Sequence, residues 1–174
     1  MCDVLSAHRQ PDRSYDIHGT WDSGMYPHTN LTEIKEFLEP IYKQRIDPSQ
    51  VALGLGFFGH SFTVKSMTCV EPGCPFVSGG KPGPCTESKD TLAISEIDDI
   101  IKQNNIKPKL YRDAAIKVAS WGDQWVGYDD VETLKLKVDF AERSCLGGLM
   151  VWAVSIDTPE GKYSKALGRF AGRI

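Results

Sequence analysis

The sequence lacks the features that would mark a membrane protein or a nucleic-acid-binding protein. No apolar stretch in its 174 residues approaches the length of about 18 residues that spans a bilayer. The segment from Met1 to Tyr15 has no apolar centre of the kind found in signal peptides. Positive charge is not in excess, since 20 Lys and Arg stand against 23 Asp and Glu, whereas nucleic-acid binders usually present a basic face. We therefore expect neither a membrane nor a nucleic acid as a partner.

Motifs that bind metals or nucleotides, or that activate a serine, are also missing. The four histidines, at positions 8, 18, 28 and 60, never take the i, i+4 spacing that places two imidazoles on one helical face for zinc. Gly54 and Gly56 form a Gly-x-Gly without the third glycine of a dinucleotide site. Neither a P-loop nor a Gly-x-Ser-x-Gly motif occurs. The sequence therefore predicts no metal, no cofactor and no serine nucleophile.

The composition that remains is that of a globular domain with α/β organisation. Hydrophobic residues make up 41% of the chain, with 16 Gly and 10 Pro, which excludes disorder and fibres. The stretch 30–33 has the pattern of a capping box, and apolar residues then recur at helical spacing, which predicts a helix near 31–44. Continuous apolar runs at 51–58 and 147–154 are too short for free-standing helices. They predict strands covered on both faces, as in a parallel sheet.

The segments around these runs also carry secondary-structure signals. They are a helix near 95–104 with Ser95 as its cap, β-rich stretches at 115–121 and 124–128, and a last helix near 162–170. The apolar residues of 130–143 fit both a helical and a strand period, and a helix between two parallel strands is the more economical interpretation. Residues 1–14 show no apolar periodicity and predict an irregular start.

Five cysteines occur, at positions 2, 69, 74, 85 and 145, and three of them lie in one Gly- and Pro-rich run. A loop of that composition cannot bury a core of its own. With no histidine nearby and no Cys-x-x-Cys pair, zinc is a poor explanation. We expect one disulfide among Cys69, Cys74 and Cys85, with free thiols as the alternative. A disulfide indicates an oxidising compartment, and because no signal peptide is present we expect that Met1 is not the natural N-terminus.

Aromatic residues are numerous, and their flat faces with polar tips match the faces of sugars. Trp121, Trp125 and Trp152 lie in strand-like runs, where burial in the core is the simpler interpretation. Tyr15 and Asp16 have no apolar neighbours in sequence that would demand burial. We therefore expect this pair at an exposed rim.

Several segments, in a consistent order along the chain, carry a family resemblance. The first is 14–22, Ser-Tyr-Asp-Ile-His-Gly-Thr-Trp-Asp, and the second is 54–62, Gly-Leu-Gly-Phe-Phe-Gly-His-Ser-Phe. The Cys-rich loop and the stretches 121–130 and 147–152 follow them. Together they resemble the family 18 glycoside hydrolases, the chitinases, in their fungal form: 14–22 is similar to the Tyr-Asp motif after the sixth strand, and 54–62 to the seventh strand. The resemblance runs from about Ser14 to Arg173.

This resemblance implies an α/β fold, the C-terminal part of a (β/α)8 TIM barrel that carries an α+β chitin-insertion subdomain. It implies an irregular N-terminus at 1–14, barrel portions at 15–58 and 129–174, and the insertion subdomain with the Cys-rich loop at 59–128. The missing half of the barrel would be encoded upstream. The partner would be chitin or chitooligosaccharides, and the location extracellular.

Catalysis in this family is substrate-assisted, because the N-acetyl carbonyl of the substrate attacks the anomeric carbon while a glutamate protonates the glycosidic oxygen, with retention. The family supplies this acid from the motif Asp-x-x-Asp-x-Asp-x-Glu. Here only Glu132 has an aspartate two residues before it, and Tyr128 and Trp125 stand at the other two positions. The acid motif is absent, so the resemblance implies a truncated chain without a catalytic residue of its own.

The resemblance carries over residues that support the sugar. Tyr15 would donate its hydroxyl toward the N-acetyl carbonyl oxygen, Asp16 would hydrogen-bond the distorted sugar, and Trp152 would form the floor beneath it. The Tyr-Gly-Arg usual after strand seven is Phe-Gly-His at 58–60, which removes a hydroxyl and a guanidinium from the groove. Three interpretations stay open: a family-level chitinase, a non-catalytic chitin-binding protein and a non-functional fragment.

Overall fold

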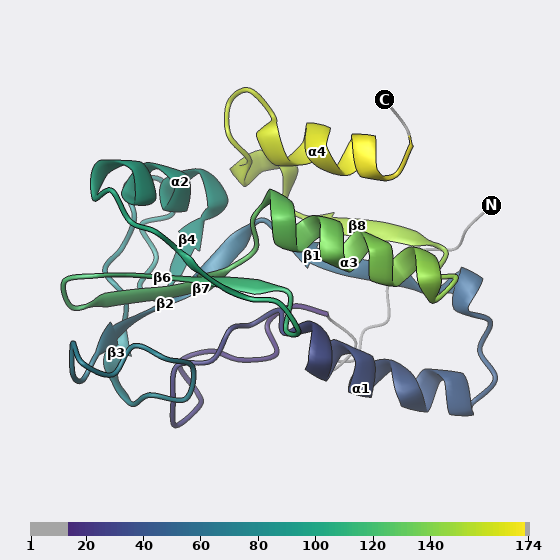
Figure 1. The fold of residues 1–174 in the computed structure, drawn as a ribbon, viewed down its shortest axis with the longest axis horizontal. Coiled ribbons are helices and arrows are strands. Elements are labelled where there is room, and N and C mark those ends of the chain that lie inside the picture. Colours follow the sequence, from purple (N-terminus) through teal and green to yellow (C-terminus); the bar gives the residue numbers. More distant parts are fainter. Residues whose placement is uncertain (1–13, 173–174) are drawn as a thin grey trace.

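The strands of the protein form two separate sheets, and the chain passes from one to the other between β1 and β2 (Figure 1). The computed structural model describes residues 14–172. Its helices are α1 (Leu31–Lys43), α2 (Ile94–Gln103), α3 (Val131–Arg143) and α4 (Lys162–Phe170), with short 3-10 helices at Pro48–Gln50 and Val154–Ile156. Its strands are β1 (Ala52–Gly56), β2 (Phe58–Val64), β3 (Phe76–Gly79), β4 (Thr91–Ala93), β5 (Lys109–Tyr111), β6 (Ile116–Trp121), β7 (Gln124–Tyr128) and β8 (Gly148–Trp152). The irregular start predicted for 1–14 lies, apart from Ser14, outside the described residues.

Strands β1 and β8 form a parallel pair, as the two apolar runs predicted. Leu53 and Leu55 of β1 are buried in a core that also holds apolar residues of α1, α3 and α4. Burial of each such side chain stabilises the fold by about 1.5–3 kcal/mol. Figure 1 shows α3 lying along both strands. Within residues 14–172, each of these two strands has only the other as a hydrogen-bonded neighbour.

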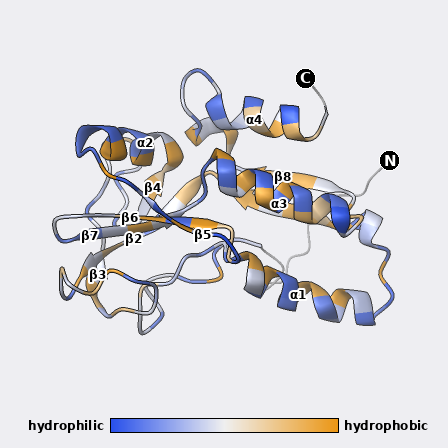
Figure 2. Cartoon of the chain, in the orientation of Figure 1, coloured by the Kyte–Doolittle hydropathy of each residue, from blue (hydrophilic) through white to orange (hydrophobic). Residues whose placement is uncertain are grey.

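The helices form where local signals predicted them. At the start of α1, Oδ1 of Asn30 accepts a hydrogen bond from the N–H of Thr32 at 3.0 Å. The segment that fitted two periods is the helix α3, because the Asp130 carboxylate accepts the N–H groups of Glu132 and Thr133 at 2.9 and 3.1 Å. In Figure 2 the helices carry both hydrophilic and hydrophobic residues, whereas β8 is mostly hydrophobic. Every helix within residues 14–172 is too short or too polar to cross a membrane.

The apolar run at 51–58 is not one continuous strand. β1 ends at Gly56 and β2 begins at Phe58. Phe57 between them is fully buried; its N–H donates to the carbonyl of Trp152 at 2.8 Å and its carbonyl accepts from the N–H of Ile94 at 2.9 Å. The chain leaves the parallel pair at this residue and enters the second sheet.

The second sheet has six strands in the order β3-β2-β7-β6-β5, with β4 also paired to β2. All of its pairings are antiparallel. The predicted stretches 115–121 and 124–128 are the hairpin β6–β7, whereas the sequence did not reveal β3, β4 and β5. Helix α2 packs against this sheet through Ile97, which shares a core with Leu92 and Val126.

The expected cap of α2 is wrong. The helix begins at Ile94, one residue before Ser95, so Ser95 lies inside the first turn. The side chain of Glu96 instead accepts a hydrogen bond from the N–H of Ala93 at 2.7 Å. A glutamate at the third position of a helix can accept a hydrogen bond from the N–H of the residue that precedes the helix. Here it satisfies the N–H of Ala93, which has no partner within the helix itself.

Candidate functional site

One face of the β1–β8 pair carries rings that come from other parts of the chain. Register places Gly54 opposite Met150 and Gly56 opposite Trp152. Side chains of register partners project from the same face and alternate along each strand, so these four residues share the face opposite Leu53 and Leu55. A Cβ on Gly54 would lie 3.1 Å from the Tyr15 ring, and one on Gly56 would lie 3.1 Å from the His28 ring. The Gly-x-Gly of β1 therefore makes room for two rings.

The Tyr15 ring occupies the space beside Gly54 that a side chain there would fill, and Tyr15 is only 5% exposed. Its ring meets Phe58 edge to face, with the centroids 5.9 Å apart. The preceding Ser14 hydroxyl accepts from the N–H of Gly54 at 2.7 Å and contacts its carbonyl at 3.0 Å. The expectation of an exposed Tyr15 is wrong, because its apolar neighbours come from β1 and β2, which are distant in sequence.

Asp16 lies between two histidines with a backbone φ of 60°, a left-handed conformation that aspartate tolerates better than most residues. Its Oδ1 is 3.1 Å from Nε2 of His60 and 3.7 Å from Nδ1 of His28. Its N–H donates to Nδ1 of His28 at 3.3 Å. The Asp16 side chain is 31% exposed, so its carboxylate remains accessible from solvent.

The two histidines beside Asp16 are residues that sequence reasoning missed. His28 is fully buried and His60 is 7% exposed, and their ring centroids lie 4.8 Å apart. Burial, reinforced by the nearby His60, lowers the pKa of His28 well below its usual value. Asp16, His28 and His60 together are a group whose potential metal-ligand atoms all lie within 4.8 Å of one another. A histidine in place of the family's arginine at position 60 was the signal that could have pointed to them.

The tryptophans divide between the surface and the core. Trp152, at the end of β8, is 59% exposed, so the interpretation of this residue as core is wrong. The peptide bond that follows it, Trp152–Ala153, is cis. Trp21 is 64% exposed, and its ring meets His60 edge to face at 5.9 Å. Trp125 is core as predicted, fully buried with Nε1 donating to the Val70 carbonyl at 2.8 Å.

The Cys-rich loop contains a disulfide between Cys69 and Cys74. The third candidate, Cys85, is an exposed free thiol, as is Cys145. The loop docks on the segment that connects Asp16 to His28, because the N–H of Gly73 donates to the Met25 carbonyl at 2.8 Å, and that of Met25 donates to the Cys74 carbonyl at 2.9 Å.

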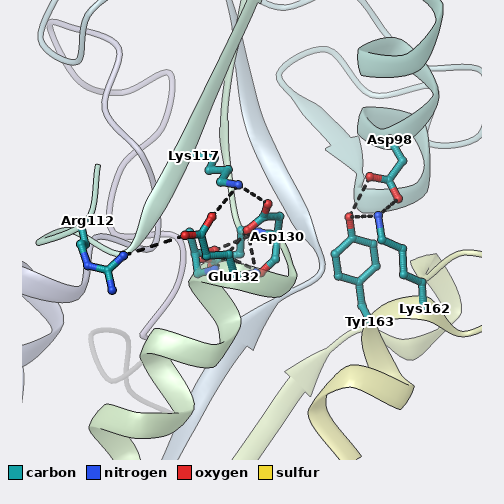
Figure 3. Close-up of polar contacts among 9 residues, drawn as sticks. Asp98, Arg112, Lys117, Asp130, Glu132, Lys162 and Tyr163 are labelled. Carbon is teal, nitrogen blue, oxygen red and sulfur yellow. Dashed lines mark hydrogen bonds and ion pairs between the residues drawn. The ribbon is translucent and has the colours of Figure 1, made fainter. Parts of the chain in front are cut away.

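A second polar cluster lies where α3 begins and where α4 faces α2. Figure 3 shows Asp98, Arg112, Lys117, Asp130, Glu132, Lys162 and Tyr163. Lys117 contacts Asp130 at 2.7 Å and Glu132 at 2.9 Å. These side chains line a cavity of about 740 Å³. Because their charges are paired with opposite charges, we interpret the cluster as structural, and Glu132 is engaged in it.

The comparison with protein families gives one match, since residues 13–157 match the family described as glycosyl hydrolases family 18. Among curated proteins, the human Chitinase-3-like protein 2 is 33% identical over 163 residues, which cover 86% of this chain and 41% of that protein. The chain thus spans less than half of that relative's length.

Solved structures agree with this match. A plant class V chitinase mutant from Cycas revoluta, in complex with (GlcNAc)3, is 27% identical with a TM-score of 0.82, covering 91% of this chain and 45% of its own. Human YKL-39, described as a pseudo-chitinase with retained chitooligosaccharide binding properties, is 30% identical with a TM-score of 0.80, covering 92% and 49%. The predicted fold class is confirmed: the described residues have the α/β fold of part of the barrel of these proteins.

Proposed function

The chain belongs to glycosyl hydrolase family 18, and from that premise we propose that it forms part of a cleft for β-1,4-linked N-acetylglucosamine chains, the chitooligosaccharides. Hydrolysis of these chains by the substrate-assisted, retaining mechanism is the family-level activity. Human YKL-39 is described as a pseudo-chitinase with retained chitooligosaccharide binding properties. Binding is the step that we assign to the residues of this chain.

The exposed indole of Trp152 carries the proposal. It projects from the sheet face that also holds the Tyr15 ring, and it is 59% exposed although its partner strand β1 is mostly buried. Sugar sites combine such flat apolar surfaces with a few directed polar groups. The accessible carboxylate of Asp16 is a polar group of this kind.

Each residue has a distinct role in this proposal. Trp152 forms the floor under one sugar ring, Asp16 accepts hydrogen bonds from that sugar, and the Tyr15 hydroxyl donates to the N-acetyl carbonyl oxygen. Because Tyr15 is packed against Gly54 and Phe58, its ring is oriented before the sugar arrives. The exposed Trp21 offers a second flat surface beside His60 for a neighbouring sugar.

The proton donor is the part of the family reaction that this sequence does not contain. A carboxylic acid must protonate the glycosidic oxygen, and the motif that supplies it is absent from these 174 residues. We propose that hydrolysis, where it occurs, takes its proton from residues outside this sequence. A non-functional fragment, the remaining alternative, would bind no oligosaccharide.

The organisation of the chain is part of the same proposal. We assign 15–58 and 129–174 to the barrel and 59–128 to the insertion subdomain. The second sheet supports this assignment, because its strands begin at Phe58, one residue before the assigned boundary, and end at Tyr128. The Cys69–Cys74 disulfide supports an extracellular location, since disulfides persist in oxidising compartments.

Titration of the purified chain with N-acetylated chitotetraose tests the proposal. We expect a saturable change in tryptophan fluorescence and a matching calorimetric isotherm. Cellotetraose, which has the same linkage without N-acetyl groups, should bind at least ten-fold more weakly. The mixture should show no cleavage by chromatography. Lack of saturable binding would reject the proposed cleft, and turnover by this chain would reject the external proton donor.

A further inference from the structure

Three side chains with metal-binding atoms converge on one point of the fold. Oδ1 of Asp16 lies 3.1 Å from Nε2 of His60 and 3.7 Å from Nδ1 of His28, and all three atoms lie within 4.8 Å of one another. Ligand atoms around a tetrahedral zinc ion lie ~3.4 Å apart when each bond is about 2.0–2.1 Å long. The two separations from Oδ1 of Asp16, 3.1 and 3.7 Å, lie on either side of this value.

The outward nitrogens of both imidazoles are committed to backbone carbonyls. Nε2 of His28 lies 3.0 Å from the Phe58 carbonyl, and Nδ1 of His60 lies 3.2 Å from the Asp90 carbonyl. A carbonyl can only accept, so each of these nitrogens carries the proton. Metal-ligating histidines almost always make this type of bond through the nitrogen away from the metal.

The inward nitrogens consequently present lone pairs. The N–H of Asp16 donates to Nδ1 of His28 at 3.3 Å, as expected for an unprotonated nitrogen. With its Nδ1 committed to the Asp90 carbonyl, His60 turns Nε2 toward an acceptor, Oδ1 of Asp16, at 3.1 Å. Two acceptors at this distance repel unless a proton or a cation lies between them.

We propose that Asp16, His28 and His60 form a binding site for one divalent transition-metal ion of the zinc class. Two imidazoles and one carboxylate are borderline ligands that suit Zn²⁺, Co²⁺ and Ni²⁺, whereas Ca²⁺ and Mg²⁺ prefer oxygen alone. Three protein ligands leave a fourth position for water in a tetrahedral site. The long hydrogen bond from the Asp16 N–H to His28 would be replaced by the metal bond.

The site could not be recognised from spacing, because its ligands come from two segments that are distant in sequence. Asp16 and His28 belong to the loop before α1, and His60 belongs to β2, 44 residues after Asp16. Asp16 is also the proposed acceptor for the sugar, but the metal ligands are defined by their mutual geometry and require no bound sugar. The alternative to a metal ion is a proton on Nε2 of His60, between this nitrogen and Oδ1 of Asp16. The two side chains would then form an ion pair.

Metal titration of the untagged, EDTA-treated chain distinguishes a metal site from a proton shared between His60 and Asp16. With Co²⁺ we expect visible ligand-field absorption that saturates at one equivalent, and with Zn²⁺ a one-to-one calorimetric isotherm that displaces it. Asp16→Asn and His60→Asn should each weaken Zn²⁺ binding at least ten-fold, and His60→Asn keeps a donor for the Asp90 carbonyl. His28→Gln keeps the donor to Phe58 and should act in the same way.

His18→Asn is the matched control. His18 contacts Asp22 at 3.1 Å and Glu33 at 2.6 Å, so it belongs to a separate histidine-carboxylate group, and its loss should leave Zn²⁺ affinity unchanged. Near-ultraviolet dichroism of each variant establishes that it is folded. Zn²⁺ should raise the unfolding midpoint of the parent chain and of His18→Asn equally, and that of the three ligand variants less. Failure of the parent chain to bind Zn²⁺ or Co²⁺ would overturn the site. Undiminished binding in both Asp16→Asn and His60→Asn would also overturn it.

Discussion

Oδ1 of Asp16 lies 3.1 Å from Nε2 of His60, although 44 residues separate them in sequence. This contact connects the two proposals, because Asp16 is both an acceptor for the sugar and a ligand for the metal. A carboxylate oxygen that coordinates a cation has fewer lone pairs left to accept hydrogen bonds from a sugar. The two ligands should therefore influence each other.

We predict that saturating Zn²⁺ weakens chitooligosaccharide binding at least ten-fold. The measurement is calorimetric titration of N-acetylated chitotetraose into the chain, once with EDTA and once with Zn²⁺. His60→Asn should remove the effect of Zn²⁺ while leaving the affinity in EDTA within about two-fold, since free energies change little where a contact with the ligand is not lost. Equal affinities with and without Zn²⁺ in the parent chain would mean that the ligands do not share Asp16.

Replacing Trp152 with alanine should weaken oligosaccharide binding by about ten-fold, equivalent to about 1.4 kcal/mol. The free energy of unfolding should change by less than about 0.5 kcal/mol, because the side chain is largely exposed. Fluorescence and urea titrations measure the two quantities. Val77→Ala on β3 removes another exposed apolar side chain and should alter neither. An unchanged affinity in Trp152→Ala would reject this residue as the floor of the cleft.

Alanine at Gly54 should destabilise the chain by about 1–3 kcal/mol, the usual cost of overpacking. Its Cβ would lie 3.0 Å from the Ser14 hydroxyl and 3.1 Å from the Tyr15 ring. Displacement of Tyr15 should also lower oligosaccharide affinity. Gly148 on β8 is the matched control, because a Cβ there would have no heavy atom within 4 Å. Gly148→Ala should be neutral or slightly stabilising in urea unfolding, and equal losses in both variants would contradict the packing explanation.

Local signals account for what could be predicted from the sequence. The cap at Asn30 directly precedes α1 and the apolar period lies within that helix, and β8 lies within the single apolar run 147–154. The end of β1 was missed because the apolar run continues into Phe57 and Phe58, and the turn there depends on a hydrogen bond to Trp152. No pattern within the run marks that long-range contact.

The candidate site was only partly visible for the same reason. Tyr15, Asp16 and Trp152 could be named from a resemblance, but their exposure could not. Tyr15 is buried because Gly54 makes room for it, and Trp152 is exposed because it ends β8 on the face opposite Leu53 and Leu55 of the core. The role of His28 depends on the loop before α1 meeting β2, and spacing within one segment cannot reveal such a contact.

Glutamine at Glu96 should destabilise the chain in a pH-dependent manner. The Glu96 carboxylate accepts hydrogen bonds from the N–H groups of Ala93, Cys85 and Thr86 and from the Thr86 hydroxyl. Burial raises the pKa of Glu96, but these hydrogen bonds outweigh it and hold the pKa below its usual value. Loss of the charged acceptor should cost about 1–3 kcal/mol at pH 7.

The sign of the pH effect follows from the lowered pKa. The unfolded chain binds the proton more readily, so the stabilisation from Glu96 is complete above about pH 5 and is lost as pH falls through the folded pKa. The difference between parent and Glu96→Gln in urea unfolding should shrink below about pH 4. Asp99→Asn, on an exposed position of the same helix, should show no such difference. A difference that stays constant from pH 7 to pH 3 would contradict the role of the Glu96 charge.

Removing the disulfide should affect both stability and binding. The disulfide joins Cys69 and Cys74 across a sequence separation of 5. It lowers the entropy of the unfolded chain, which stabilises the fold by about 2 kcal/mol in the chain-entropy model. The loop holds Met25 through two backbone hydrogen bonds, and Met25 lies between Asp16 and His28 in sequence. The double variant Cys69→Ser, Cys74→Ser should therefore lose stability in urea unfolding and bind oligosaccharide more weakly.

Cys85→Ser and Cys145→Ser remove exposed free thiols and should change neither quantity. Mass spectrometry of an unreduced digest should show the peptides of Cys69 and Cys74 joined; alkylation of both without reduction would contradict the bridge and remove the support for an extracellular location.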